Sequence, residues 1–487
     1  MRLIPLLLAL TVSACASLSD RARTQLAAPG LEGTRWGLVV MTLDGKEIAA
    51  INPDERFLPA SNTKLFTAAA AFHRLGDMTR SDPAMGASLR LIASEDEPPS
   101  LFLVGAGDAM LLDAPDCARD CLSDLANAVV MNGITKVDQV IADETLYTRE
   151  PWPPGWPQDD LVTRSGAPVS ALTVNSNEFG LIITPGDAVG DPARIAWRGG
   201  PEFYDIDNHV VTVAADTPDD TPGGVEIAAE RIPGDTDVRI HGRIRLGAPP
   251  LNLAVAVHDP AWAAATRLSE LLQARRIEVT GGIEARYRPI RPFDPAAAMF
   301  DAPRPGVEIA RLLPPPLIED VTFLMKQSQN LHAELLLRRI GLVDGDGSRE
   351  AGLKVVEAMI AETGAPRWSW DLSDGSGMSV YNRVTPRTVA GLLLWTSHQP
   401  WAEAFRATLP VGGVDGSIRR RFAGTSLEGR IFAKTGTLMG TNGLSGFLVA
   451  KSGQTLIFSA FANERPSSTG SATPALDATL VTIAETN

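Results

Sequence analysis

Cysteine is scarce in this 487-residue chain, which has only three. Cys117 and Cys121 lie four residues apart, and no histidine or second cysteine pair is near them in sequence, so a zinc site is not expected. A disulfide between them and a pair of free thiols are both compatible with the sequence. On a regular helix, this spacing would make a bridge difficult without distortion.

Basic residues are also few, and lysine is the rarer kind. The chain has 44 basic and 58 acidic residues, a formal charge of −14, and no basic block. This balance argues against a nucleic-acid partner. Only seven of the basic residues are lysines, so arginine supplies most of the positive charge. Because arginine stays protonated in proteins, a lysine within a motif stands out as a candidate base.

Long apolar runs are absent beyond the start of the chain, so no later segment is expected to span a membrane. Residues 1–16 are predicted to be a signal peptide, with a positive start and an apolar run. Residues 12–15 resemble the lipobox of bacterial lipoproteins, which would leave Cys15 lipidated at a membrane surface. Residues 14–16 also fit an A-x-A cleavage site, which would release a soluble protein. We therefore expect an exported, periplasmic protein, either soluble or lipid-anchored.

The pattern along the chain predicts one core that is split in sequence. Two β-branched runs around a D-G turn predict a hairpin over residues 36–51, and a helix is expected over residues 61–75. Helical patterns return after about residue 310 and are followed by three strand-like runs and a last helix. The two ends are expected to meet in one sheet. Residues 18–35 are interpreted as a polar tether and an entry segment.

Residues 86–299 differ from both ends, with short alternating strands, many prolines and glycines, and one clear amphipathic helix over residues 261–275. This texture predicts one or two inserted α/β modules. We therefore expect an α/β (α+β) protein in which residues 24–85 and 300–487 form one domain, and residues 86–299 form two nested inserted domains.

The segment Ser61-Asn62-Thr63-Lys64 places a hydroxyl and an amine on one face of the expected helix. A serine oxygen is a poor nucleophile until a base takes its proton, and a lysine can be that base when burial lowers its pKa. The N–H of Ser61 at the helix start would favour a developing oxyanion. Alone, S-x-x-K is a weak signal, because a helix cap beside a surface lysine explains it equally well.

A second motif is Ser328-Gln329-Asn330, the only S-x-N in the chain. Its hydroxyl could relay a proton to a leaving group, and its amide could hold a substrate carbonyl or Lys64. An ordinary turn between two helices remains an equal alternative for this motif on its own.

A third motif is Lys434-Thr435-Gly436-Thr437, where the chain enters the terminal strands. An edge strand there would offer its backbone to an extended peptide. Gly436 would let that peptide approach, and the threonine hydroxyls could bind a carboxylate. Residues 451–453 also fit K-[ST]-G, but they lie between two apolar runs and predict a hairpin turn.

No Ser-His-Asp triad can be recognised in the sequence. The six histidines are scattered and lie in no G-x-S-x-G or H-E-x-x-H context, so each is expected to be a surface or packing residue. His332, two residues after Asn330, is the one to examine in a structure.

Taken together, the three motifs resemble those of β-lactamases and penicillin-binding proteins. The chain resembles more closely the D-alanyl-D-alanine carboxypeptidase/endopeptidase family of class C low-molecular-mass penicillin-binding proteins, because the gap between Ser61 and Ser328 matches the large insertion of that family. Further local likenesses occupy residues 105–108, 166–177, 374–377, 381–383 and 412–416. Residues 374–377 are either a turn only or part of the active-site rim. One departure is Ala109-Met110, where the family usually has Pro-Thr, in a loop expected to be distant from the chemistry.

The resemblance implies a penicillin-binding/serine β-lactamase-like transpeptidase core, with an antiparallel sheet flanked by helices, that acts on peptidoglycan stem peptides. Ser61 would attack the carbonyl of the penultimate D-Ala, with Lys64 as its base. Ser328 and Lys434 would pass the proton to the leaving amine, and Asn330 would help to hold the substrate.

The resemblance also implies how the substrate is bound. The oxyanion would lie against the backbone N–H groups of Ser61 and Thr437, and the terminal carboxylate near Thr435, Gly436 and Thr437. Release of the terminal D-Ala is carboxypeptidase action, and cleavage of a D-Ala cross-link is endopeptidase action. β-Lactams would be covalent inhibitors, and no metal or organic cofactor is implied.

Two rival functions are compatible with the same motifs. A β-lactamase shares the acylation machinery but needs rapid deacylation, for which the sequence shows no dedicated base. A catalytically silent envelope protein would use the fold for binding or as a scaffold.

Overall fold

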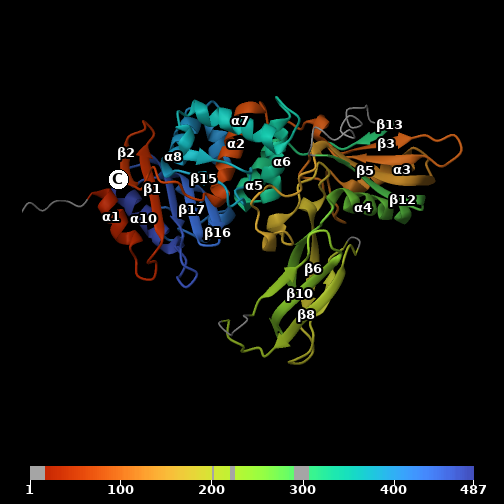
Figure 1. Ribbon diagram of the computed structural model, residues 1–487, viewed down its shortest axis with the longest axis horizontal. Coiled ribbons are helices and arrows are strands. Elements are labelled where there is room, and N and C mark those ends of the chain that lie inside the picture. The colour runs from red at the N-terminus through yellow and green to blue at the C-terminus, as the bar shows by residue number, and fades with distance from the viewer. Residues whose placement is uncertain (1–16, 200–201, 220–224, 290–305) are drawn as a thin grey trace, which may run out of the picture.

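The computed structural model describes residues 17–199, 202–219, 225–289 and 306–487 (Figure 1). The predicted signal peptide, with Cys15, lies outside the described residues. Within the described ranges, no helix has both the length and the apolar character needed to cross a bilayer.

The two ends of the chain meet in a five-stranded antiparallel sheet of order β16-β17-β18-β1-β2 (Figure 1). Its strands are β1 (Arg35–Thr42), β2 (Glu47–Ile51), β16 (Ile431–Leu438), β17 (Thr441–Val449) and β18 (Thr455–Asn463). Because β1 pairs with β18 along its whole length, the N-terminal hairpin and the C-terminal strands form one unit. This confirms the predicted shared sheet, and β16 lies at its edge.

Alternate side chains of β1 enter two different cores, one on each face of this sheet, and helices pack in both. Val39 and Met41 pack in one core, and Leu38 and Val40 in the other. The first core is built with α2 (Thr63–Arg74), α5 (Leu317–Gln327), α6 (Asn330–Gly341), α7 (Arg349–Glu362), α8 (Pro386–Ser397) and α9 (Ala402–Thr408). The second core is built with α1 (Leu18–Leu26) and α10 (Thr473–Thr486). This arrangement confirms the predicted fold class.

A second five-stranded sheet, of order β12-β5-β4-β3-β13, lies at the other end of the molecule (Figure 1). Its strands are β3 (Ser88–Ile92), β4 (Ser100–Val104), β5 (Lys136–Thr148), β12 (Glu278–Arg288) and β13 (Val307–Arg311). Helices α3 (Leu122–Met131) and α4 (Pro260–Ala274) pack into its core. The strand β13 follows residue 299 in the chain and pairs with β3.

Two three-stranded sheets share a third core and project from the rest of the molecule (Figure 1). One, of order β11-β6-β7, contains β6 (Glu178–Thr184), β7 (Arg194–Trp197) and β11 (Leu251–Ala256). The other, of order β8-β10-β9, contains β8 (Asp205–Val213), β9 (Ile227–Glu230) and β10 (Asp237–Arg245). We call these two sheets the small-sheet module. The division into domains at residues 86 and 299 stays a prediction.

The segment 18–35 is not the simple tether that the sequence suggested. Residues 18–26 form helix α1, which Ser17 and Asp20 cap by reciprocal hydrogen bonds. Ala22 and Leu26 are buried in the core that α1 shares with α10. The polar residues of segment 18–26 therefore lie on the exposed face of a helix whose other face packs against the core.

Cys117 and Cys121 form a disulfide. The bridge avoids the helical spacing that the sequence suggested, because Cys121 is the N-cap of α3 and Cys117 lies in the turn before it. Asp120, immediately before Cys121, has a left-handed backbone with φ of 57°, and the Cα atoms of the two cysteines are 5.9 Å apart.

Candidate active site

Ser61 lies in a 3-10 turn, Ala60–Asn62, which leads directly into α2. The turn is tight: Ala60 has a φ of 48°, an uncommon backbone conformation for alanine. Gly377 packs so close behind it that a Cβ atom there would lie 1.9 Å from the carbonyl oxygen of Ala60. The backbone on both sides therefore holds the serine at the start of the helix.

Lys64 follows one helical turn after Ser61 and is fully buried. Its Nζ lies 2.9 Å from Ser61 Oγ, 2.6 Å from Asn330 Oδ1 and 2.6 Å from the carbonyl oxygen of Ser376. The amide and carbonyl oxygens can only accept hydrogen bonds, so they use two N–H groups of the amine. A neutral amine has only those two, and its lone pair is left to face the hydroxyl of Ser61.

Burial lowers the pKa of Lys64 to about 7, and the negative charges of Asp374 and Glu334 limit this fall. At neutral pH, a large fraction of Lys64 is therefore neutral. The amine can then accept a proton without first losing one, which is what a general base requires.

The Ser328–Asn330 turn joins the end of α5 to the start of α6. Ser328 is the C-cap of α5 and has a left-handed backbone with φ of 60°. Asn330 Oδ1 accepts the hydrogen bond from Lys64, while its Nδ2 donates to the carbonyl oxygen of Ser165 at 2.9 Å. The second motif is therefore a turn between helices, as its plain interpretation held, and it also contacts the amine of the first motif.

Lys434 reaches the same turn from the edge strand β16. Its Nζ lies 2.7 Å from Ser328 Oγ and 2.9 Å from the carbonyl oxygen of Thr435. The side chain is fully buried, and burial, with the nearby charge of Lys64, lowers its pKa well below the usual lysine value. The structure thus brings the three motifs together. Lys64 contacts Ser61 and Asn330, and Lys434 contacts Ser328.

Strand β16 places alternate side chains on its two faces. Thr437 is exposed and lines the cleft beside Ser61, and Thr435 bonds through its hydroxyl to Ser417 at 2.8 Å. Gly436 is buried instead, and a Cβ there would lie 2.5 Å from the carbonyl oxygen of Pro59. The glycine therefore lets β16 pack against the Ser61 turn, and its predicted role in substrate approach stays a prediction. Residues 451–453 form the turn between β17 and β18, as expected.

The loop 372–382, between the paired strands β14 (Trp370–Asp371) and β15 (Arg383–Val384), forms the wall behind Lys64. Asp374 is fully buried and accepts hydrogen bonds from five groups. These are Trp156 Nε1, Ser376 Oγ, Asn382 Nδ2 and the N–H groups of Gly377 and Ser379. Residues 374–377 are therefore part of the site, which decides between the two interpretations in favour of the second.

Two contacts in this wall were not among the predicted site residues. One is the backbone carbonyl of Ser376, which accepts a hydrogen bond from Lys64; every residue type has such a carbonyl, so the sequence cannot indicate it. The other is Glu334, fully buried on α6, which accepts the N–H groups of Gly375 and Ser376. A signal for Glu334 did exist, since it lies four residues after Asn330 and hence on the same helix face.

His332 does have partners that make a serine–histidine–aspartate trio. Its Nδ1 donates to Asp320 Oδ1 at 2.6 Å, and its Nε2 lies 2.9 Å from Ser176 Oγ. His332 and Asp320 are both buried, and none of the three residues lines the Ser61 cleft. The trio joins α5 and α6, on either side of the Ser328 turn, to segment 166–177.

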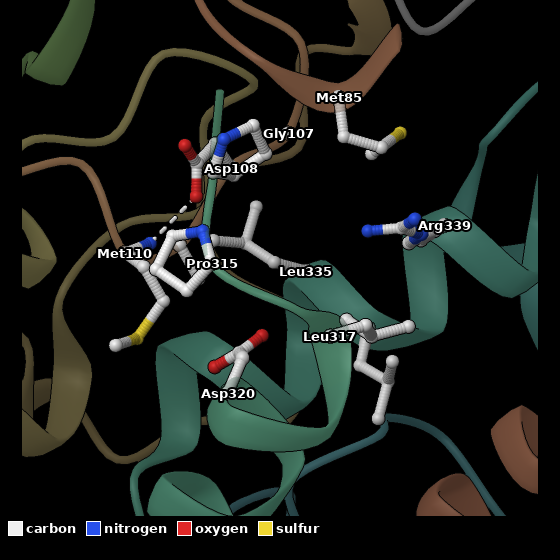
Figure 2. Close-up of a pocket in the computed structure, with 12 residues that line it drawn as sticks. Met85, Gly107, Asp108, Met110, Pro315, Leu317, Asp320, Leu335 and Arg339 are labelled. Atoms are coloured by element: carbon white, nitrogen blue, oxygen red, sulfur yellow. Dashed lines mark hydrogen bonds between the residues drawn. The ribbon is translucent and has the colours of Figure 1, made fainter. Parts of the chain in front are cut away.

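A small cavity of about 20 Å³ is lined by Asp320, one member of this trio (Figure 2). Asp320 and Asp108 face it from α5 and from loop 105–110, and Arg339 reaches it from α6. Asp108 accepts the N–H of Met110 at 2.8 Å, and burial raises its pKa well above the usual aspartate value. The cavity shares no lining residue with the Ser61 cleft.

Ser61 opens into a cleft of about 460 Å³. Its walls come from β16, from the loop 372–382, from α6 and from segment 158–166, and they are formed by Ser61, Asp159, Asp160, Ser165, Asn330, Gly377, Met378, Thr437, Leu438 and Met439. Across the described part of the chain, no group of three or more His, Cys, Asp or Glu side chains is arranged to hold a metal ion.

A helix-flanked antiparallel sheet with a serine, two buried lysines and an S-x-N turn beside its edge strand defines the class of penicillin-binding and serine β-lactamase-like proteins. Within that class, the chain belongs to the D-Ala-D-Ala carboxypeptidase 3 (S13) family, because the model of that family matches residues 18–486. It is thus a hydrolase of the D-Ala-D-Ala carboxypeptidase type.

Individual relatives agree with this assignment. The D-alanyl-D-alanine carboxypeptidase of Actinomadura sp. is 32% identical, over 93% of this chain and 84% of the relative. A D-alanyl-D-alanine carboxypeptidase of Haemophilus influenzae is 25% identical, over 89% of this chain and 86% of the relative. The crystal structure of penicillin binding protein 4 from H. influenzae superimposes with a TM-score of 0.76 at 23% identity, covering 94% of each chain. The same fold is recorded for that protein in complex with a β-lactam, with a TM-score of 0.73.

Proposed function

We propose that Ser61 is the nucleophile of a D-Ala-D-Ala carboxypeptidase that forms an acyl-enzyme with peptidoglycan stem peptides, and that the same site cuts D-alanyl cross-links as an endopeptidase. One observation carries the proposal: the buried amine of Lys64 spends two N–H groups on Asn330 and Ser376 and turns its third position toward the Ser61 hydroxyl.

The acylation step follows from this arrangement. Ser61 Oγ bonds to the carbonyl carbon of the penultimate D-Ala while its proton moves to Lys64 Nζ. The N–H groups of Ser61 and Thr437 bind the oxyanion. As the C–N bond breaks, the proton passes through Ser328 and Lys434 to the leaving nitrogen, and Lys64 is neutral again. The contact between Lys434 Nζ and Ser328 Oγ supports this route.

Deacylation returns the enzyme to its starting state. Water attacks the ester carbon, its proton is taken up by the same amine, and the proton then returns to Ser61 Oγ as the C–O bond breaks. The product is the shortened stem peptide, with a new D-Ala carboxylate, so that the two steps together consume one water per peptide bond.

The edge strand supports carboxypeptidase and endopeptidase action alike. A substrate that extends along β16 would place its terminal carboxylate near Thr435 and Thr437, with Gly436 holding the strand against the Ser61 turn. In carboxypeptidase action, the leaving group is a free D-Ala. In endopeptidase action, it is the amine of a second peptide strand. The open cleft of about 460 Å³ supports the larger leaving group.

We propose further that β-lactams acylate Ser61 and remain attached. The related H. influenzae protein has been solved in complex with a β-lactam, which supports this inhibitor class. The substrate also implies export to the periplasm, with the chain either soluble or anchored through Cys15. The mass of the mature N-terminus distinguishes these two states, because lipidation would add acyl chains to Cys15.

The test is a labelling experiment with fluorescent penicillin, combined with release of D-Ala from a muropeptide pentapeptide. We expect one persistent labelled band, a drug adduct on the peptide that contains Ser61, and D-Ala release that Ser61→Ala abolishes. Rapid turnover of the drug without a labelled band would indicate a β-lactamase instead. A wild-type protein that releases no D-Ala and takes no label would be a scaffold, and the proposal would be wrong.

A further inference from the structure

Glu334 is a fully buried carboxylate that the acylation steps above do not use. It lies on α6, and its Oε1 accepts hydrogen bonds from the N–H groups of Gly375 at 3.0 Å and Ser376 at 2.8 Å. Among the described residues, its second oxygen, Oε2, is buried and has no hydrogen-bond partner. A carboxylate with one bonded and one unbonded buried oxygen is costly to keep charged, so its retention here calls for a reason.

The same short loop connects Glu334 to Lys64. Glu334 holds the N–H side of Ser376, and the carbonyl oxygen of Ser376 accepts the hydrogen bond from Lys64 Nζ at 2.6 Å. Glu334 therefore both aims the carbonyl that holds the base and places a carboxylate near it. Two roles are combined in one side chain, one geometric and one electrostatic.

We propose that Glu334 is a positioning residue that sets the pH at which Lys64 becomes a neutral base, through its charge and through its hold on the Ser376 loop. The inference rests on the proposed role of Lys64 as the base for Ser61. It adds that the pH range of the enzyme is determined on α6, outside the three sequence motifs.

The sign of the effect follows from the charges that face Lys64. Burial lowers the pKa of Lys64 to about 7, and the carboxylates of Asp374 and Glu334 raise it. Burial and the neighbouring Asp374 raise the pKa of Glu334 itself to about 7, while Arg338 and the bonds from Ser376 lower it. Removal of the Glu334 charge should therefore lower the pKa of Lys64 and leave the base neutral at a lower pH.

Three other cationic groups and one other carboxylate pack around Lys64 and Glu334. Lys434 faces Lys64 from β16, and its pKa is lowered by burial and by Lys64. Arg338 and Arg349, from α6 and α7, are both bonded to Glu150, so each already has a carboxylate partner. Asp374 accepts five hydrogen bonds that fold the loop, so its removal would test folding instead of charge. Glu334 is the carboxylate that can be neutralised with its geometry kept.

The test is the variant Glu334→Gln, whose amide oxygen can still accept the N–H groups of Gly375 and Ser376. The rate of acylation by fluorescent penicillin is measured between pH 5 and pH 9. We expect the acid limb of the profile to move to lower pH by about one unit, as expected for loss of a nearby opposite charge. A matched control is Glu144→Gln, which neutralises another buried carboxylate, with a pKa of about 8, that is bonded to Ser170. Its profile should coincide with that of the wild type.

Two further measurements separate charge from structure. Glu334→Asp keeps the charge but shortens the reach to the loop, so its acid limb should stay near that of the wild type while the rate at high pH falls. Because the chain has only seven lysines, carbon-13 labelling of their ε-carbons can follow Lys64 without an activity assay. In the wild type, this signal should titrate near pH 7 in a broadened curve, because the two groups titrate together.

The outcomes are distinguishable. A folded Glu334→Gln protein with an unshifted acid limb would overturn the inference and leave the Ser61 mechanism intact. If the Gln and Asp variants do not fold, a simple one-proton titration of Lys64 in the wild type would overturn it. A wild type that is not acylated at any pH would instead contradict the proposed function itself.

Discussion

The Ser61 cleft and the small-sheet module differ in where their charged side chains lie: they are buried around Ser61 and exposed in the module. Around Ser61, Lys64, Lys434, Glu334 and Asp374 are all fully buried, and each makes hydrogen bonds to other protein groups. In the small-sheet module, ion pairs such as Arg194 with Asp187 lie at the surface, with 59% and 87% of their side chains exposed. Solvent screens such exposed pairs, whereas burial shifts pKa values and stores electrostatic energy. Burial therefore shifts the pKa values of Lys64, Lys434 and Glu334 beside Ser61.

The largest expected effect is the loss of the nucleophile. Ser61→Ala should lower the rate of D-Ala release by at least about 10³-fold and remove covalent labelling by penicillin, because Ser61 Oγ is the hydroxyl that Lys64 Nζ contacts. The measurement is intact mass after incubation with the drug. Ser452→Ala is the matched control, since Ser452 is exposed in the turn between β17 and β18, and it should be labelled as the wild type is. A drug adduct on the Ser61→Ala variant would contradict the role of Ser61 as the nucleophile.

The next effect concerns the buried trio beside the cleft. His332→Gln should lower the free energy of unfolding by about 2 kcal/mol, because it leaves Asp320 without its buried partner. It should also lower the acylation rate severalfold, since the trio joins the two helices that flank Ser328. Denaturant unfolding and penicillin labelling measure the two effects. His209→Gln, at an exposed histidine paired with Asp207, should change neither, and equal effects in both variants would contradict the account.

A smaller and separable effect is expected at the disulfide. Removal of the Cys117–Cys121 bridge by two serine substitutions should lower the free energy of unfolding by about 2 kcal/mol, since the closed loop is short. The acylation rate should stay within about twofold of the wild type, because neither cysteine lines the cleft. A large loss of acylation in a folded variant would show that loop 105–121 acts on the site.

The smallest effect belongs to the small-sheet module. Arg194→Ala removes an exposed ion pair and should change neither the midpoint of thermal unfolding nor the acylation rate beyond experimental error. A clear loss of activity in this variant would mean that surface charge in the module takes part in substrate binding.

The sequence predicted the local parts of this site better than the long-range ones. Ser61 and Lys64 are three residues apart, so helical geometry alone placed them on one face. The shared sheet followed from a hairpin at one end and three strand-like runs at the other. The meeting of Lys434 with Ser328, 106 residues apart, could be expected only because the motifs resemble a known family.

Other features carried little or no readable signal. The carbonyl of Ser376 is a backbone group, so its contact with Lys64 depends on the course of the loop and not on the residue type. Glu334 is one charge among several on α6, and only its burial sets it apart. Helix α1 did have a capping signature in Ser17 and Asp20, but its polar composition concealed it. Helix α9, with only seven residues, is too short to show a clear period.

The central claim is that Lys64 acts as a neutral amine, and the most direct measurement is the pH dependence of acylation by fluorescent penicillin, in the wild type and in Lys64→Arg. Below about pH 7, the wild-type rate should fall as protonation removes the base, by less than tenfold per pH unit near pH 7, where Lys64 and Glu334 titrate together; above that pH it should level off. Lys64→Arg should not be acylated at any pH, because a guanidinium stays protonated. A wild-type rate that is flat from pH 5 to pH 9, or an arginine variant that is acylated as fast as the wild type, would contradict the account.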